Sequence, residues 1–184
     1  MRKDRLVRVG GAAAILAGLL RAAASFAGGA GSEVERQALY FIIDVLLLLG
    51  ALAAYLPHAD ALGNWGAGAF LTAITGILLV RSSRAVPGFD LYPEGAALVA
   101  IGWVGLSFTR WKQAGGTAFV PLLFVLSVLL GFLSQIPGRA AALLGASGVT
   151  FGAAMVGVGR QLLSAAAVAP NDKATRRLDP GHRR

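Results

Sequence analysis

The apolar residues of this chain are gathered into runs that are long enough to cross a lipid bilayer. A membrane-spanning helix needs about 20 predominantly apolar residues, and residues 39–56 and 119–133 are especially rich in Leu, Val, Ile and Phe. Of the 184 residues, 56% are hydrophobic and 14% are charged, whereas a soluble domain carries about 25% charged residues. We therefore expect an all-α fold, a polytopic transmembrane helix bundle.

Six such runs can be placed along the chain, near residues 9–27, 38–56, 64–81, 94–109, 118–136 and 140–160. The breaks between them contain turn-forming Gly and Pro residues. This pattern predicts a transmembrane helical domain over residues 1–167. Residues 168–184 are polar and basic and contain two prolines, which predicts a disordered cytoplasmic tail.

The distribution of Lys and Arg predicts the orientation, because cytoplasmic connections carry an excess of both. If the N-terminus is inside, the inner side holds Arg2, Lys3, Arg5, Arg8, Arg110, Lys112, Arg160, Lys173, Arg176, Arg177, Arg183 and Arg184. The outer side then holds only Arg36, Arg81, Arg84 and Arg139. We expect a multi-pass protein of the cell membrane with both termini in the cytoplasm. The same distribution explains the net charge of +8 without a nucleic-acid partner.

The first run has an alternative interpretation as a cleaved signal peptide. Its basic start, its apolar residues 9–20 and the small residues at 22–24 resemble the parts of such a peptide. Arg21, however, lies where a signal peptide is normally neutral. We expect the helix to be retained, and cleavage would leave five spans.

The two halves of the chain resemble each other. A shift of 80 positions aligns Pro57 with Pro137 and Gly68 with Gly148, and a shift of 84 aligns Gly18 with Gly102. Shared composition is the alternative explanation. If the repeat is real, each unit has three spans, so the second unit must cross the membrane in the opposite direction, which gives a 3+3 inverted-topology repeat of a kind found in transporters.

Small residues recur at four-residue spacing in the third and sixth runs. Gly68, Thr72 and Gly76 form one stripe, and Gly148 and Gly152 form its counterpart. Such stripes let membrane helices approach closely. They predict helix packing within the chain, or a face for a homo- or hetero-oligomer.

Two charged residues lie inside the predicted spans and require an explanation. At a rise of 1.5 Å per residue, Arg21 lies roughly 9 Å and Asp44 roughly 8 Å below the same outer boundary, on adjacent helices. Because an unpaired charge in the hydrocarbon is costly, we expect a buried Arg21–Asp44 ion pair. The alternative is that Arg21 extends to the headgroups while Asp44 faces a polar cavity, and the pair is also a candidate ligand site.

Catalytic and cofactor chemistry has little support in the sequence. The chain has no cysteine, and its two histidines, His58 and His182, lie outside the spans, so we expect no metal ion or other cofactor. Ser147 lies in a Gly-x-Ser-Gly string found in intramembrane serine proteases, but no span offers a histidine as base. We expect no enzyme. The first functional hypothesis is a structural or accessory subunit whose partner is the lipid bilayer and, through small-residue faces, other chains. The second is a small-molecule binding or transport protein with a site near Arg21 and Asp44.

Overall fold

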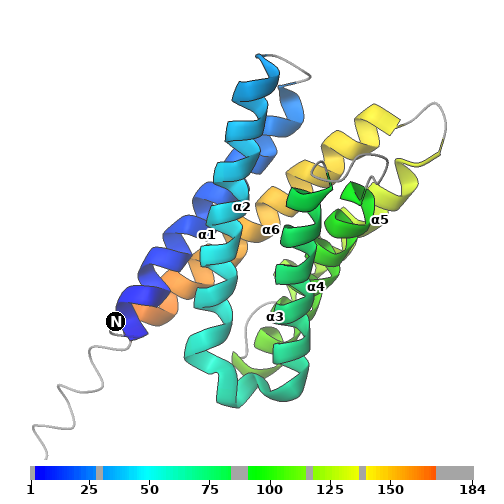
Figure 1. Cartoon of the computed structure of the whole chain (residues 1–184). Coiled ribbons are helices and arrows are strands. Elements are labelled where there is room, and N and C mark those ends of the chain that lie inside the picture. Colours follow the sequence, from blue (N-terminus) through cyan, green and yellow to red (C-terminus); the bar gives the residue numbers. More distant parts are fainter. Residues whose placement is uncertain (1–2, 28–30, 84–90, 115–117, 137–139, 169–184) are drawn as a thin grey trace, which may run out of the picture.

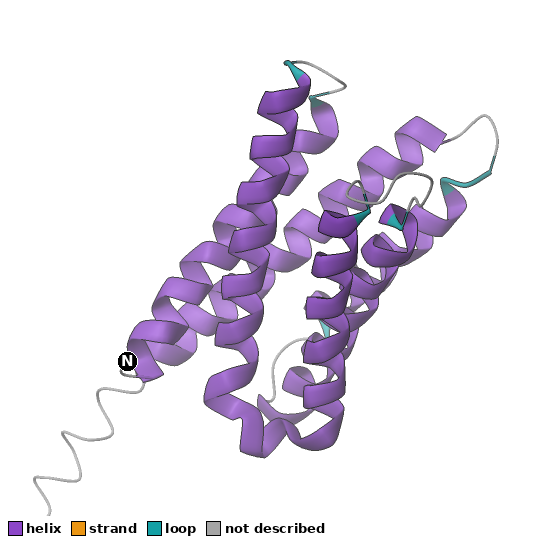
Figure 2. Cartoon of the chain, viewed as in Figure 1, coloured by secondary structure: helices purple, strands orange, loops and turns teal. Residues whose placement is uncertain are grey.

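Helices form all of the regular structure that can be described. The computed structural model describes residues 3–27, 31–83, 91–114, 118–136 and 140–168, and within them every regular element is helical (Figure 2). The elements are α1 (Lys3–Phe26), α2 (Glu33–Tyr55), the short 3-10 helix η1 (Leu56–His58), α3 (Ala59–Ser82), α4 (Tyr92–Ala114), α5 (Phe119–Leu133) and α6 (Ala140–Val168). Each predicted run has one α-helix as its counterpart. The predicted tail, apart from Val168, lies outside the described residues.

Several of the helical segments match the dimensions of a membrane. By length and composition, Lys3–Phe26, the continuous segment Glu33–Ser82 and Ala141–Ala167 could cross a bilayer, and Phe119–Leu133 is a shorter apolar helix. The segment Glu33–Ser82 contains α2, η1 and α3. The all-helical architecture of a membrane protein is therefore supported, and the count of six spans stays a prediction.

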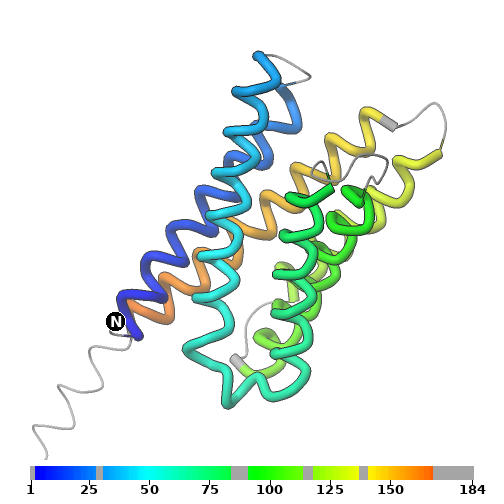
Figure 3. Tube along the Cα trace, viewed as in Figure 1, coloured from blue at the N-terminus to red at the C-terminus, as the bar shows by residue number. Residues whose placement is uncertain are grey.

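The bounds of α2 follow from local chemistry. At its start, the Ser32 hydroxyl accepts from the Glu35 N–H at 3.3 Å, and the Glu35 carboxylate accepts from the Ser32 N–H at 2.7 Å. This reciprocal capping box satisfies two backbone donors that the helix leaves open. At its end, Pro57 has no N–H to continue the ladder, and the chain passes through η1 and turns back into α3 (Figure 3). Within α3, Gly63 forms a kink with φ 58°, a value that favours glycine.

The helices form two closely packed antiparallel pairs, α1 with α6 and α3 with α4. In Figure 1 the start of α1 lies beside the end of α6. Glycines set the separation of the first pair: an added Cβ on Gly18 would overlap the backbone oxygen of Gly152. In the second pair, a Cβ on Gly102 would overlap the backbone of Ala73. Close backbone approach through small residues is typical of helices in lipid, where dispersion contacts replace hydrophobic burial.

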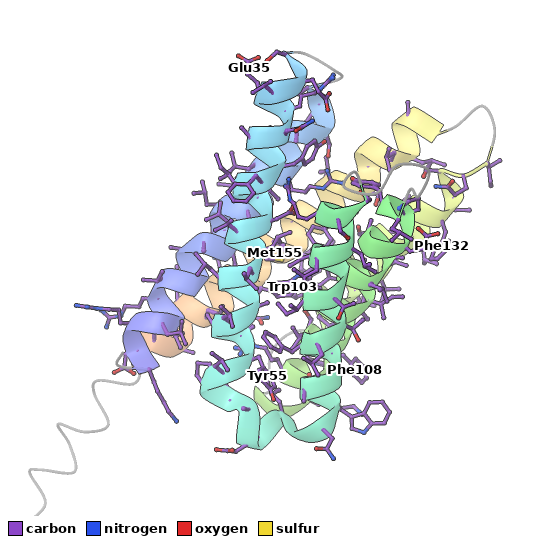
Figure 4. All side chains as sticks on the ribbon, in the orientation of Figure 1. Glu35, Tyr55, Trp103, Phe108, Phe132 and Met155 are labelled. Atoms are coloured by element: carbon purple, nitrogen blue, oxygen red, sulfur yellow. The ribbon has the colours of Figure 1, made fainter. Side chains whose placement is uncertain are left out.

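Large side chains fill the space between these pairs. The largest fully buried ones are Trp103, Phe124, Ile43, Leu106, Met155 and Leu162. The Trp103 and Phe124 rings stack with centroids 5.9 Å apart, and Phe151 meets Phe124 edge-on at 5.3 Å. Figure 4 shows Trp103 and Met155 near mid-length of the bundle, far from Glu35 at one end of α2 and Tyr55 at the other. The described centre of the protein is thus apolar and aromatic.

Candidate functional site

The candidate site is built on one face of α2. Tyr40, Phe41 and Asp44 lie three and four positions apart, so their side chains share that face of the helix. Arg21 reaches this face from α1 and Arg81 reaches it from α3. The result is two guanidinium groups and one carboxylate on three neighbouring helices.

Asp44 pairs with Arg81 rather than with Arg21. The Nε of Arg81 donates to Oδ2 of Asp44 at 2.5 Å, and the Arg81 guanidinium lies 5.4 Å from the centroid of the Phe41 ring. The two side chains are 35% and 16% exposed, respectively, so the bond is partly shielded from solvent and lipid. Among the described residues no salt bridge joins Arg21 to Asp44, and the expected pair is corrected to Asp44–Arg81. Equal depth is necessary for a contact but does not fix the rotation of each helix about its axis.

Arg21 lies nearby with an aromatic partner. Its guanidinium is 5.8 Å from the centroid of the Tyr40 ring, a cation–π distance, and its charge acts favourably on the Asp44 carboxylate. Behind it, the Ser25 hydroxyl donates to the Arg21 carbonyl at 3.0 Å. Gly148 of α6 packs here: an added Cβ would overlap Ser25 Oγ and lie 3.8 Å from Cζ of Arg21. Gly148 therefore keeps α6 close to the guanidinium.

The remaining residues of the small-residue stripes have different surroundings. Gly76 is buried against the backbone of α4, and Gly152 is buried against Gly18 of α1. Gly68 is exposed, with nothing within 4 Å of an added Cβ. The Thr72 hydroxyl donates to the Gly68 carbonyl at 2.8 Å. Gly76, Gly148 and Gly152 therefore lie at contacts within the chain, whereas Gly68 and Thr72 face outward.

A second polar cluster, at the opposite end of α2, was not found from the sequence. Arg110 of α4 is buried, and its Nη1 donates to the Ala54 carbonyl at 2.8 Å and lies 3.3 Å from Nδ1 of His58. The last carbonyls of a helix need external donors, and Arg110 supplies one to Ala54 near the end of α2. Burial lowers the pKa of His58, and the charges of Arg110 and Lys3 lower it further. The sequence had placed Arg110 just beyond the fourth span, and the Pro57 break was the only signal that a donor was needed.

Two serines form hydrogen bonds between α5 and α6. The Ser127 hydroxyl donates to the Ser147 carbonyl at 2.9 Å, and the Ser147 hydroxyl donates to the Ser127 carbonyl at 2.8 Å. Ser147 is the serine of the Gly-x-Ser-Gly string, and its hydroxyl is used in this reciprocal bond. The geometry is that of an interhelical fastening rather than of an activated nucleophile, which would donate to a base.

Two buried polar groups on α4 have no partner among the described residues. They are Nε1 of Trp103 and Oγ of Ser107, which lie one helical turn apart. A buried donor or hydroxyl without a hydrogen bond costs stability. The polar contacts between helices therefore lie toward the ends of α2 and along α5–α6, while the middle of α4 carries unsatisfied groups.

No known protein guides the assignment: comparison with family models, with curated proteins and with solved structures finds no match for this chain. Within the described part of the chain, no group of three or more metal-ligating side chains is assembled. The Arg21–Asp44–Arg81 cluster is thus the arrangement with the most distinctive chemistry, because it sets two permanent cations beside one carboxylate.

Proposed function

We propose that this protein is a six-span protein of the cell membrane with both termini in the cytoplasm. The excess of Lys and Arg on one predicted side supports this orientation. The antiparallel packing of α1 and α6 supports it too, because the start of α1 and the end of α6 then lie on the same side (Figure 1). The close contacts of Gly11 and Gly18 with α6 support retention of the first span rather than its removal.

A 3+3 inverted-topology repeat is part of this proposal. An in-plane twofold axis that exchanges α1 with α4 and α6 with α3 would carry the α1–α6 pair onto the α4–α3 pair, and these are the two glycine-lined pairs. Gly18 and Gly102, which the sequence shift aligns, each lie at a close backbone approach of their respective pairs. Gly68 and Gly148, which the other shift aligns, have different surroundings, since Gly68 is exposed and Gly148 packs against Ser25 of α1.

The function that the geometry supports best is that of a structural or accessory subunit in the membrane. The observation that carries it is the packing: the described interior is filled by apolar side chains such as Trp103 and Phe124, and Asp44 is closed by its bond to Arg81. A transporter needs a polar path through the interior, past Trp103, Phe124 and the Asp44–Arg81 pair. An accessory protein needs only a stably packed interior and exposed helix faces that can contact other chains. The exposed Gly68 and Thr72 face is where a further helix could approach closely.

The mass of the protein after extraction from its native membrane tests the accessory role. The full chain, tagged and expressed at its natural level, is extracted in a mild detergent and its protein mass is measured by light scattering. An accessory role predicts a mass well above the 18.9 kDa of one chain. A single-chain mass, together with no cross-linked partner in intact membranes, would refute it.

A second function, small-molecule binding near Arg21 and Asp44, is favoured by one observation. Arg21 brings a guanidinium into the predicted span, and no carboxylate of the described residues forms a salt bridge with it. Ionisable residues inside transmembrane segments are rare and mark substrate or ion pathways in many membrane proteins. Equilibrium binding of candidate solutes to the wild type and to Arg21→Gln distinguishes this function from the accessory role.

A further inference from the structure

Among the described residues, the positive and negative charges of the Arg21–Asp44–Arg81 cluster do not balance. Arg81 is bonded to the carboxylate of Asp44, and Arg21 lies over the ring of Tyr40, four residues before Asp44 on α2. Since arginine stays protonated in proteins, the cluster keeps one excess positive charge over the working range of pH. Glu33, the first residue of α2, is bonded to Arg36 at 2.5 Å.

The two guanidinium groups are held in a similar way. Arg21 lies over the ring of Tyr40 and Arg81 lies over the ring of Phe41, which are consecutive residues of α2. An arginine that rests on an aromatic ring keeps the N–H donors on its edge available, and these donors match two oxygens of a phosphate or carboxylate. Arg81 uses its Nε on Asp44. No carboxylate among the described residues engages the donors of Arg21.

The backbone around Arg21 leaves room for its guanidinium. A Cβ added on Gly148 of α6 would lie 3.8 Å from Cζ of Arg21, which is an ordinary van der Waals distance, so α6 approaches the guanidinium without crowding it. The side chain of Arg21 is half-buried rather than enclosed. Its predicted depth, roughly 9 Å below the outer boundary at 1.5 Å per residue, lets a long side chain extend toward the headgroup region.

We propose that Arg21 binds a single oxyanion of the phosphate class at the outer end of α1 and α2, beside the Asp44–Arg81 pair. Asp44 neutralises Arg81, so the site offers one net positive charge and fits a monoanionic phosphodiester better than a doubly charged phosphate. The phosphodiester of a phospholipid headgroup and a free phosphate share this chemistry. The inference rests on the second function above, and it names the class of ligand for that site.

The test uses the full chain, purified in detergent and stripped of lipid. Its thermal unfolding midpoint is followed while a short-chain phosphatidylglycerol is titrated in one arm and inorganic phosphate in the other. The site predicts a saturable rise of the midpoint for the wild type. Arg21→Gln should weaken the apparent binding at least tenfold, and Arg21→Lys should lie between, because it keeps the charge but loses the planar fork.

Arg36→Gln is the matched control, because Arg36 is an arginine of α2 that pairs locally with Glu33, and it should respond like the wild type. A rise of the unfolding midpoint with the lipid alone supports the site, assigns it to a phospholipid headgroup and excludes a soluble phosphate as its ligand. A rise with phosphate alone assigns it to a soluble oxyanion. Identical responses of the wild type and Arg21→Gln, or no response of the wild type in either arm, would overturn the proposal. If Arg21→Gln does not fold, the wild type is compared with Arg21→Lys. Weaker binding by Arg21→Lys supports the proposal, and equal binding overturns it.

Discussion

The bond between Asp44 and Arg81 should contribute strongly to the stability of the end of the bundle at which α2 begins. Breaking a fully buried ion pair costs about 3–5 kcal/mol, whereas an exposed pair is worth about 0.2–1 kcal/mol. The side chains of Arg81 and Asp44 are 35% and 16% exposed, which is between these limits. We therefore expect Arg81→Gln to lower the free energy of unfolding by about 2 kcal/mol, because it leaves a shielded carboxylate without its partner.

A double-mutant cycle isolates the coupling energy between Asp44 and Arg81. Asp44→Asn, Arg81→Gln and the double variant are unfolded reversibly in mixed micelles with increasing SDS, and the coupling energy should be about 1–2 kcal/mol. A parallel cycle with Asp44→Asn and Arg21→Gln should give a smaller coupling, because Arg21 has no salt bridge to Asp44. Additive losses for Asp44 and Arg81, or a stronger coupling to Arg21, would refute the pairing.

Three further expectations can be measured in the same unfolding assay. Gly102→Ala should destabilise the α3–α4 pair by about 1–3 kcal/mol through overpacking, since the added Cβ would overlap the α3 backbone. Gly68→Ala has open space around it and should be neutral or stabilising by up to about 1 kcal/mol. Ser127→Ala should cost about 1 kcal/mol by removing an interhelical hydrogen bond, whereas Ser107→Ala should be neutral or stabilising because its hydroxyl is unsatisfied. Because the folded state lowers the pKa of His58, the unfolded chain binds the proton more readily, so stability should fall as pH decreases through 6.5, the value for an unperturbed histidine. His58→Gln should remove that dependence, and an unchanged pH profile would contradict it.

Part of the candidate site could be recognised from single residues. Arg21 and Asp44 stood out because a charge inside an apolar run is costly in lipid. Arg81 was assigned to the outer boundary, although α3 continues through it to Ser82. Arg110 was likewise placed just beyond a span, although α4 continues to Ala114. Helices extend past the hydrocarbon, so hydropathy marks where lipid ends rather than where the helix ends.

The apolar runs determined by themselves that this chain forms membrane helices, because lipid provides no partner for an open backbone and helices satisfy their own N–H and C=O groups. Pro57 and the turn residues near it also set where one helix gives way to the next. The depth of a residue along its helix could be predicted from its position in the apolar run, but the rotation of the helix about its axis could not. That rotation was decided by tertiary packing, where glycines such as Gly18 and Gly102 bring particular helix faces together. Only this packing turned Asp44 toward Arg81 and left Arg21 over Tyr40. Two side chains on different helices make contact only when they lie at the same depth and their helices turn them toward each other.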